Sequence, residues 1–273
     1  HSKTEGWITG IRLSAAALQQ SPDNSHIPRA LSGNIKEISD YLFSEVIEKL
    51  PSEVQEFLAK TSLLERFSAP LCNQLLGISN SKQMLADLAK QNLFLEHLDH
   101  SGIWFRYHGL FQEALQSRLT QSDPEVISTL HQRASSWFSA AGEFDLAIYH
   151  AHQAADDLGA AALLDRHIDD LWEKGEFTTI LKWAQKIDPA AFSDRTQLSV
   201  YLSLALVFTG DLHQGRQRLQ QLDKQTSTGR GDGAQGWLAA AKTYLAYFQR
   251  DIPEIIPAAE QALALLPDQD HTW

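Results

Sequence analysis

Apolar residues in the first 122 positions recur mostly at intervals of three and four, the spacing of one buried face of an α-helix. An opening helix is expected over residues 6–18. Further helices are predicted to begin at residues that cap or start helices, namely Asn34, Pro51, Pro70 and Asn80 or Ser81. Gly77 is a suitable residue to end the helix that Pro70 begins. This part of the chain is therefore predicted to be a series of short amphipathic helices.

One stretch departs from the helical spacing and predicts a β-hairpin. The runs at 93–95 and 103–107 are rich in β-prone residues, and the tip between them, Asp99–Gly102, contains Asp, Ser and Gly. A helix is predicted to follow from about His108, with an apolar face formed by Leu110, Phe111, Ala114, Leu115 and Leu119. Helices, then a hairpin, then a helix indicate a winged-helix module.

From Asp123-Pro124, a typical helix start, the pattern becomes repetitive. A turn residue followed by an acidic and an apolar residue recurs at Gly142-Glu143-Phe144, Gly175-Glu176-Phe177, Gly210-Asp211-Leu212 and, in a degenerate copy, Arg250-Asp251-Ile252. A helix with aromatic residues precedes each turn and a second helix follows it. A period near 34 residues with helix–turn–helix units is typical of tetratricopeptide-like repeats, which stack into a superhelix. The aromatic residues are expected to form the core between repeats.

The predicted fold is therefore all-α with one short β-hairpin: a winged-helix domain over 34–122, then a tetratricopeptide-like α-superhelix over 123–273. No apolar run reaches the length of a membrane helix, no signal peptide is recognisable, and Cys72 has no second cysteine to pair with. A cytoplasmic protein is expected. The net charge of −11 falls mostly on residues 123–273, and neither half offers a clustered basic face. Direct DNA binding by this chain is therefore disfavoured.

Few residues point to chemistry. The sequence has no phosphate-binding loop of the G-x-x-x-x-G-K-[ST] type, and the glycine-rich stretch 229–233 is interpreted as a flexible loop. The pairs His97 with His100 and His150 with His152 lack the spacing of a convergent zinc site, so no metal is expected. No catalytic triad or dyad is specified by spacing, and we expect the chain not to be an enzyme by itself.

His108 is the exception, because it lies where the second hairpin strand meets the following helix. Free backbone N–H groups and the dipole at a helix start favour anions, and an imidazole at that place can contact a phosphate. The alternative is a structural histidine that bonds a nearby backbone group. The residues alone leave both interpretations open.

Several segments resemble a known family in matching order. They are Gly6–Leu13, Phe57–Phe67 with Leu71-Cys72, Asn92–Leu95, Trp104–Phe111, Leu130–Ala134 with Trp137-Phe138, and Ala147–Ala151. Together they resemble the large ATP-binding LuxR-type transcription regulators, the MalT-like branch of the STAND ATPases. The resemblance covers residues 4 to about 160, and beyond these it depends mainly on the repeat pattern.

The resemblance implies a four-part parent protein: an ATPase domain, a winged helix, a superhelical sensor and a C-terminal DNA-binding domain. Residues 1–33 are then expected to end the helical portion of the ATPase module, and the chain to be a central piece without the phosphate loop or the DNA reader. ATP or ADP with Mg is expected in the parent protein, not in this piece. His108 is carried over as an ADP-phosphate contact, with Arg106 as its companion. Gly109 departs from the family, whose members often have a second histidine there.

What the resemblance implies for mechanism is a switch. The winged helix holds an ADP-bound resting state, and an inducer, either a small molecule or a regulatory protein, binds the repeats and favours exchange for ATP. The active form is expected to self-associate and to contact DNA only through a domain outside this chain, without a membrane. The main alternative is a tetratricopeptide-like scaffold for protein partners, with no nucleotide role.

Overall fold

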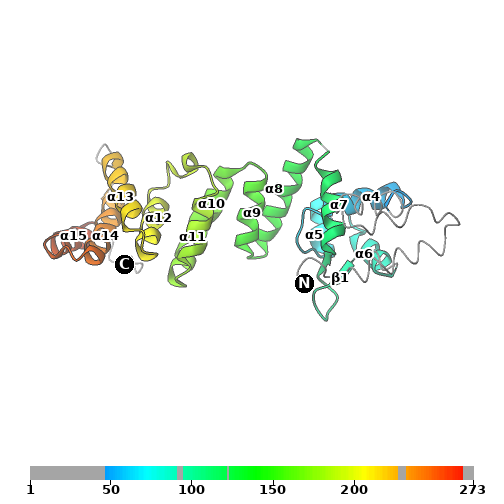
Figure 1. Cartoon of the computed structure of the whole chain (residues 1–273), viewed down its shortest axis with the longest axis horizontal. Coiled ribbons are helices and arrows are strands. Elements are labelled where there is room, and N and C mark those ends of the chain that lie inside the picture. Colours follow the sequence, from blue (N-terminus) through cyan, green and yellow to red (C-terminus); the bar gives the residue numbers. More distant parts are fainter. Residues whose placement is uncertain (1–46, 91–94, 122, 227–231, 267–273) are drawn as a thin grey trace, which may run out of the picture. The chain divides into compact units, whose positions relative to one another are not determined.

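The computed structural model of the protein describes residues 47–90, 95–121, 123–226 and 232–266 (Figure 1). The helices predicted over 6–18 and from Asn34 lie outside the described residues. The chain forms two compact units, residues 1–137 and 138–273, which are described separately below. Within the described residues both are built from helices, apart from one two-stranded antiparallel sheet in the first unit, so the predicted fold class is confirmed.

The first unit has the element order of a winged helix. Its helices and strands are α4 (Ser52–Thr61), α5 (Ala69–Leu76), α6 (Ser81–Lys90), β1 (Leu95–His97), β2 (Phe105–Tyr107) and α7 (Gly109–Leu119), followed by the start of α8 (Pro124–Ala140). Helix α4 packs against α5 and α7, and α5 packs against α6. The boundary between the two compact units falls within α8, past the boundary predicted at residue 122.

Most of the predicted helix ends are observed with the expected chemistry. Pro70 lies in the first turn of α5, and Gly77 ends that helix in the left-handed conformation, with φ of 71°. The side chain of Asp123 accepts a hydrogen bond from the backbone N–H of Glu125, which caps α8. Pro51 lies one position before α4, not in its first turn as predicted.

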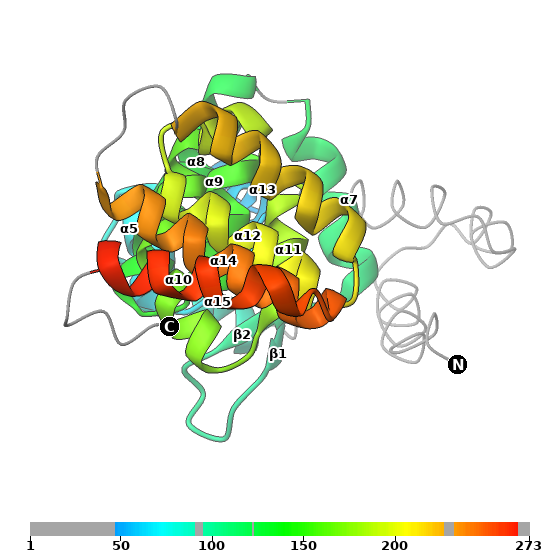
Figure 2. The same cartoon turned by 90° about the vertical axis from the view of Figure 1, so that its left-hand side faces the viewer.

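Strand β2 is shorter than the predicted run 103–107, and the hairpin tip is closed by one aspartate. Strand β1 begins at Leu95, and residues 93 and 94 lie outside the described part of the chain. The Asp99 carboxylate accepts hydrogen bonds from the N–H groups of Ile103 and Trp104 at 3.0 and 3.2 Å. Gly102 takes φ of 67°, a conformation that L side chains rarely adopt. Figure 2 shows the tip as a loop extending beyond the two strands.

Aromatic rings join the hairpin to the helices of the first unit. Phe67 and Phe105 exchange two backbone hydrogen bonds of 2.8 Å, which form an isolated antiparallel bridge beside β2. The ring of Tyr107 packs between Phe67 and Phe111, at centroid distances of 4.5 and 5.7 Å. The surrounding core is formed by buried side chains of the helices, among them Phe57, Leu58, Leu71, Cys72, Leu75, Leu85 and Leu115.

The second unit is a row of helices in chain order. Its elements are α9 (Phe144–Gln153), α10 (Asp157–Glu173), α11 (Phe177–Ala184), the short helix η2 (Pro189–Phe192), α12 (Thr196–Phe208), α13 (Leu212–Thr226), α14 (Asp232–Gln249) and α15 (Ile252–Leu265). Each of these α-helices packs against the next one in the chain (Figure 1). The helix–turn–helix units predicted from the sequence are therefore observed, and their assignment to the tetratricopeptide class stays a prediction.

One backbone turn recurs in all four predicted repeats. Its first residue is left-handed, with φ of 77° at Gly142, 70° at Gly175, 94° at Gly210 and 59° at Arg250. In each case the N–H of the following acidic residue bonds the carbonyl five residues back, at 2.8 to 2.9 Å. This is the Schellman arrangement, which satisfies carbonyl groups at the end of a helix. Ala155, between α9 and α10, forms the same turn with φ of 58°.

Buried aromatic residues form much of the core of the second unit, and the polar atoms of two of them donate hydrogen bonds to aspartates. The Trp183 indole donates to Asp145 at 2.6 Å, and the Tyr201 hydroxyl donates to Asp169 at 2.6 Å. Both side chains are essentially inaccessible, as predicted for core between repeats. Tyr247 departs from that prediction, because 66% of it is exposed. No helix in the described ranges has the length and apolarity needed to cross a bilayer.

The left-handed Arg250 carries a conformational cost that glycine avoids. Because its side chain is exposed, few contacts are lost on replacement. We expect Arg250→Gly to raise the free energy of unfolding by about 1 kcal/mol, and Gly210→Ala to lower it by a similar amount. Urea unfolding followed by circular dichroism measures both. A destabilised Arg250→Gly variant would contradict the turn geometry.

The buried His131, on α8, makes the free energy of unfolding depend on pH. The side chain is 8% exposed, and burial lowers its pKa from 6.5 to about 4. The unfolded state therefore binds a proton first, and stability should fall as the pH decreases from 6.5 to 4, by up to about 3 kcal/mol. Unfolding midpoints across this range, compared with those of His131→Gln, test this: the variant should show a shallower loss.

Candidate functional site

His108 occupies the position predicted for it, at the junction of β2 and α7. It is the N-cap of α7, with extended backbone angles, and its side chain forms no capping hydrogen bond. Its carbonyl accepts the N–H of Gln112 at 2.9 Å, the first bond of the helix. The side chain is half-buried, and the next residues place their N–H groups at the helix start, where an anion is favoured.

Arg106, the predicted companion of His108, has a partner across the hairpin. Its Nε donates to Glu96 Oε2 at 2.7 Å, and the two residues lie directly opposite in the strand register. Both side chains are about half exposed, at 49% and 41%. An ion pair this exposed contributes no more than about 1 kcal/mol, so a phosphate can compete with Glu96 for the guanidinium.

Two glutamines fix α7 against the end of α4. Gln112 Nε2 donates to the carbonyls of Ser62 and Leu64 at 2.9 and 3.0 Å, and Gln116 Nε2 donates to Ser62 at 2.8 Å. These carbonyls follow the last turn of α4 and need partners. The position of His108 is therefore set by side chains one and two turns further along α7.

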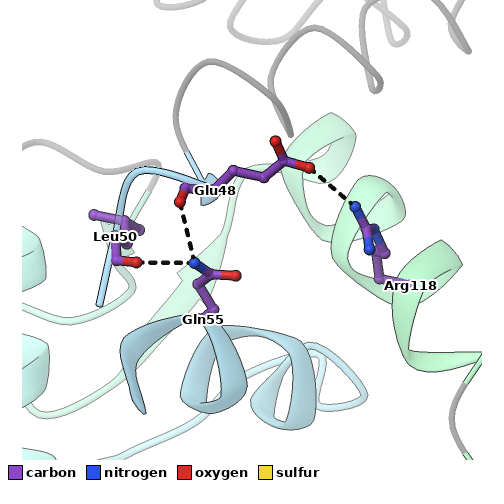
Figure 3. Close-up of polar contacts among 4 residues, drawn as sticks. All are labelled: Glu48, Leu50, Gln55 and Arg118. Carbon is purple, nitrogen blue, oxygen red and sulfur yellow. Dashed lines mark hydrogen bonds and ion pairs between the residues drawn. The ribbon is translucent and has the colours of Figure 1, made fainter. Parts of the chain in front are cut away.

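A second set of polar contacts connects the segment before α4 with α7 (Figure 3). Gln55 Nε2 donates to the carbonyl of Leu50 at 2.8 Å and more weakly to that of Glu48 at 3.3 Å. The Glu48 side chain pairs with Arg118, near the C-terminal end of α7, at 3.3 Å. The Gln55–Leu50 bond is partly buried, whereas the Glu48–Arg118 pair is exposed and adds little stability.

Tyr107, the residue before His108, forms a buried hydroxyl–hydroxyl hydrogen bond with Thr61. The Tyr107 and Thr61 hydroxyls are 2.6 Å apart, and Thr61 also donates to the carbonyl of Phe57 at 2.7 Å. Tyr107 therefore donates to Thr61. Burial raises the pKa of Tyr107 above its ordinary value, so this hydroxyl stays neutral.

Gly109, the departure from the family pattern, is open to substitution. A Cβ at this position would meet nothing within 4 Å, and its φ does not require glycine. The missing second histidine is therefore not explained by lack of space.

The charged residues of the hairpin and α6 are of mixed sign. Lys90 pairs with Asp87 at 3.4 Å, and the hairpin carries Glu96 and Asp99. A DNA surface needs several clustered cations, whereas Lys90 and Arg106 are each paired with a carboxylate here.

The other candidate residues occupy structural positions. Cys72 is buried, and desolvation raises the pKa of its thiol to about 12, so it is unreactive near neutral pH. His97 packs against Phe105, and His150 stacks on Phe138. His152 instead contacts Asp157 at 2.8 Å. Within the described ranges no three His, Cys, Asp or Glu residues form a group that could hold a metal ion.

Sequence reasoning missed Thr61, Gln112 and Gln116. Their long-range partners lie 46 to 54 residues away in the chain, beyond the reach of local sequence patterns. The spacing of the two glutamines on one face of α7 was the only available signal.

The model of the MalT winged helix domain matches residues 43–127. The serine/threonine-protein kinase PknK of Mycobacterium tuberculosis is 32% identical over 204 residues, 75% of this chain and 18% of that protein. The HTH-type transcriptional regulator MalT of Klebsiella pneumoniae is 34% identical over 169 residues, and that of Cronobacter sakazakii is 32% identical over 177. These cover 61% and 64% of this chain. The chain spans about a fifth of the length of these relatives, at 18% and 20% of the two regulators. The winged helix is thus MalT-like, and the chain is similar to transcription regulators.

The Thr61–Tyr107 pair should respond unequally to removal of its two members. Thr61→Val leaves the buried Tyr107 hydroxyl without an acceptor, which should cost about 1–3 kcal/mol of unfolding free energy. Tyr107→Phe removes the hydroxyl itself, and Thr61 keeps its bond to Phe57, so the cost should be under about 1 kcal/mol. Equal losses in chemical denaturation would contradict this assignment of donor and acceptor.

Proposed function

We propose that this chain is the regulatory and signal-sensing part of an ATP-dependent transcription activator. The winged helix holds an ADP-bound resting state, and the helical repeats bind an inducer or a regulatory protein. The supporting observation is the MalT-like winged helix, in which His108 is the N-cap residue of α7 and its side chain makes no capping hydrogen bond.

The two kinds of relative favour a regulatory role for this segment over a role in kinase activity or DNA binding itself. One is named a serine/threonine-protein kinase and the others HTH-type transcriptional regulators, yet all share this segment. A segment common to a kinase and to DNA-binding regulators cannot supply the output activity of both. We therefore propose that it controls whichever output domain accompanies it, and that it is not itself an enzyme.

The residues at the start of α7 fit a nucleotide phosphate. The His108 side chain makes no capping bond, and the Arg106 guanidinium forms an exposed pair with Glu96. The two glutamine anchors keep the helix start in place, so these groups need little reorganisation to bind. When bound, ADP supplies the negative charge that His108 and Arg106 contact. Mg and the phosphate loop belong to the ATPase domain expected elsewhere in the parent protein.

The switch then follows from differential affinity. An inducer on the repeats can release the resting state only if it binds the open form more tightly. The open form exchanges ADP for ATP, self-associates and uses a DNA-binding domain outside this chain. We propose a cytoplasmic location and no membrane partner.

The scaffold function remains the second candidate because the last helix pair exposes apolar side chains. Tyr247, Ile252, Ile256 and Leu263 are 66%, 69%, 62% and 81% exposed. Contiguous exposed apolar residues can mark a protein-binding surface. This function predicts partner binding without any nucleotide.

The test is nucleotide content, measured in the purified parent protein that contains this chain. We expect wild type to retain ADP through purification, and His108→Ala to retain at least about tenfold less, since a hydrogen bond to a charged group is lost. The protein is denatured and the released nucleotide is quantified by chromatography.

The matched control is His100→Ala, which removes an exposed histidine at the hairpin tip and should retain ADP like wild type. Equal ADP in wild type and His108→Ala would make His108 structural. Absence of nucleotide from a folded wild-type protein would favour the scaffold.

A further inference from the structure

Arg218, on α13, is a half-buried cation without a partner. No hydrogen bond or ion pair joins its guanidinium to another residue in the part of the chain that the structure describes, and burial lowers its pKa. Arg195 is also half-buried, and its charge is neutralised by an ion pair with Asp165 at 2.7 Å. A desolvated charge is expensive unless it is paired. In a unit this acidic, an unpaired arginine is unexpected.

Arg218 lines a cavity of about 260 Å³ between α12, α13 and η2. Figure 2 shows α12 and α13 side by side. Helix α13 contributes Arg218, Gln221, Leu222 and Gln225, which share one face because they are three, four and seven positions apart. The remaining wall is formed by Ser199, Leu202 and Ser203 of α12 and by Pro189, Phe192 and Ser193 around η2.

The polar groups of the wall favour an anion. The guanidinium offers a planar fork of donors that matches a carboxylate, and the amide of Gln221 lines the same cavity and can add a further donor. Ser203 donates its hydroxyl hydrogen to the Ser199 carbonyl at 2.8 Å, so that hydrogen is already committed. The nearest carboxylate along α13, Asp223, is held by Lys242 at 2.9 Å.

The apolar part of the wall distinguishes among anions. Pro189, Phe192, Leu202 and Leu222 present carbon surface beside the arginine. A fully polar anion such as inorganic phosphate would leave this surface uncovered, whereas a carboxylate with a short hydrocarbon chain would cover it. The volume is below that of a typical drug-sized pocket, so the ligand is small.

We infer that the cavity between α12, α13 and η2 is a binding site for a small carboxylate with an apolar chain, which Arg218 clamps. This inference deepens the proposed sensing role, because it gives the repeats a ligand class. The ligand bridges α12 and α13, two consecutive helices of one repeat, and therefore stiffens that repeat when bound.

The experiment is calorimetric titration of the whole chain with sodium butyrate, sodium acetate or sodium phosphate, at constant pH and ionic strength. We expect butyrate to bind most tightly and Arg218→Gln to weaken it at least tenfold. The matched control is Lys224→Gln, which removes one exposed charge from the same helix and should bind like wild type.

Arg218→Gln should also fold, with an unchanged or higher melting temperature in the absence of ligand, because an unpaired charge is removed. Failure of that variant to fold would reveal a structural role and overturn the inference. So would equal binding of phosphate and butyrate, unchanged binding by Arg218→Gln, or no binding of butyrate to wild type. None of these results depends on ADP retention in the parent protein, so the two proposals fail separately.

Discussion

The free carbonyl groups at helix ends are the constraint on which this structure depends. An α-helix leaves its last carbonyls without internal donors, and a protein made of short helices has many such ends. In the second unit the chain solves the problem locally, with a left-handed residue and a backbone bond at each repeated turn. In the first unit it also uses distant side chains. Gln112 and Gln116 reach the end of α4, and Arg133 reaches the carbonyl of Leu75 at the end of α5, at 2.9 Å.

The two solutions have different consequences for function. A local turn completes each helix end without help from distant segments, which suits a row of helix pairs that contact only their neighbours. A side chain that reaches across 50 residues instead ties α7 to α4. The start of α7, where His108 lies, is therefore positioned by the fold as a whole. Such preorganisation is what a phosphate clamp requires.

The charges of the two units also differ in how they are used. In the first unit Arg106 and Arg118 pair with glutamates at the surface, where a competing anion meets little resistance. In the second unit aspartates also form such pairs, but two of them accept hydrogen bonds from buried aromatic side chains, in the pairs Asp145–Trp183 and Asp169–Tyr201. Arg218 differs from these residues, because its charge is partly buried and no carboxylate in the described part of the chain neutralises it.

The sequence by itself determined the local features: the class of fold, the hairpin and its tip, and the glycine turns that end the helices. These follow from backbone preferences of Gly, Pro and Asp that act over a few residues. It also located His108 at a helix start. Only the tertiary structure decided which distant groups meet. Packing of separate elements decides the partnership of Arg106 with Glu96 and the glutamine anchors of α7. It also decides that Arg218 has no partner among the residues that the structure describes. The left-handed Arg250 shows the same limit, since the repeat imposes on arginine a conformation that its own preferences disfavour.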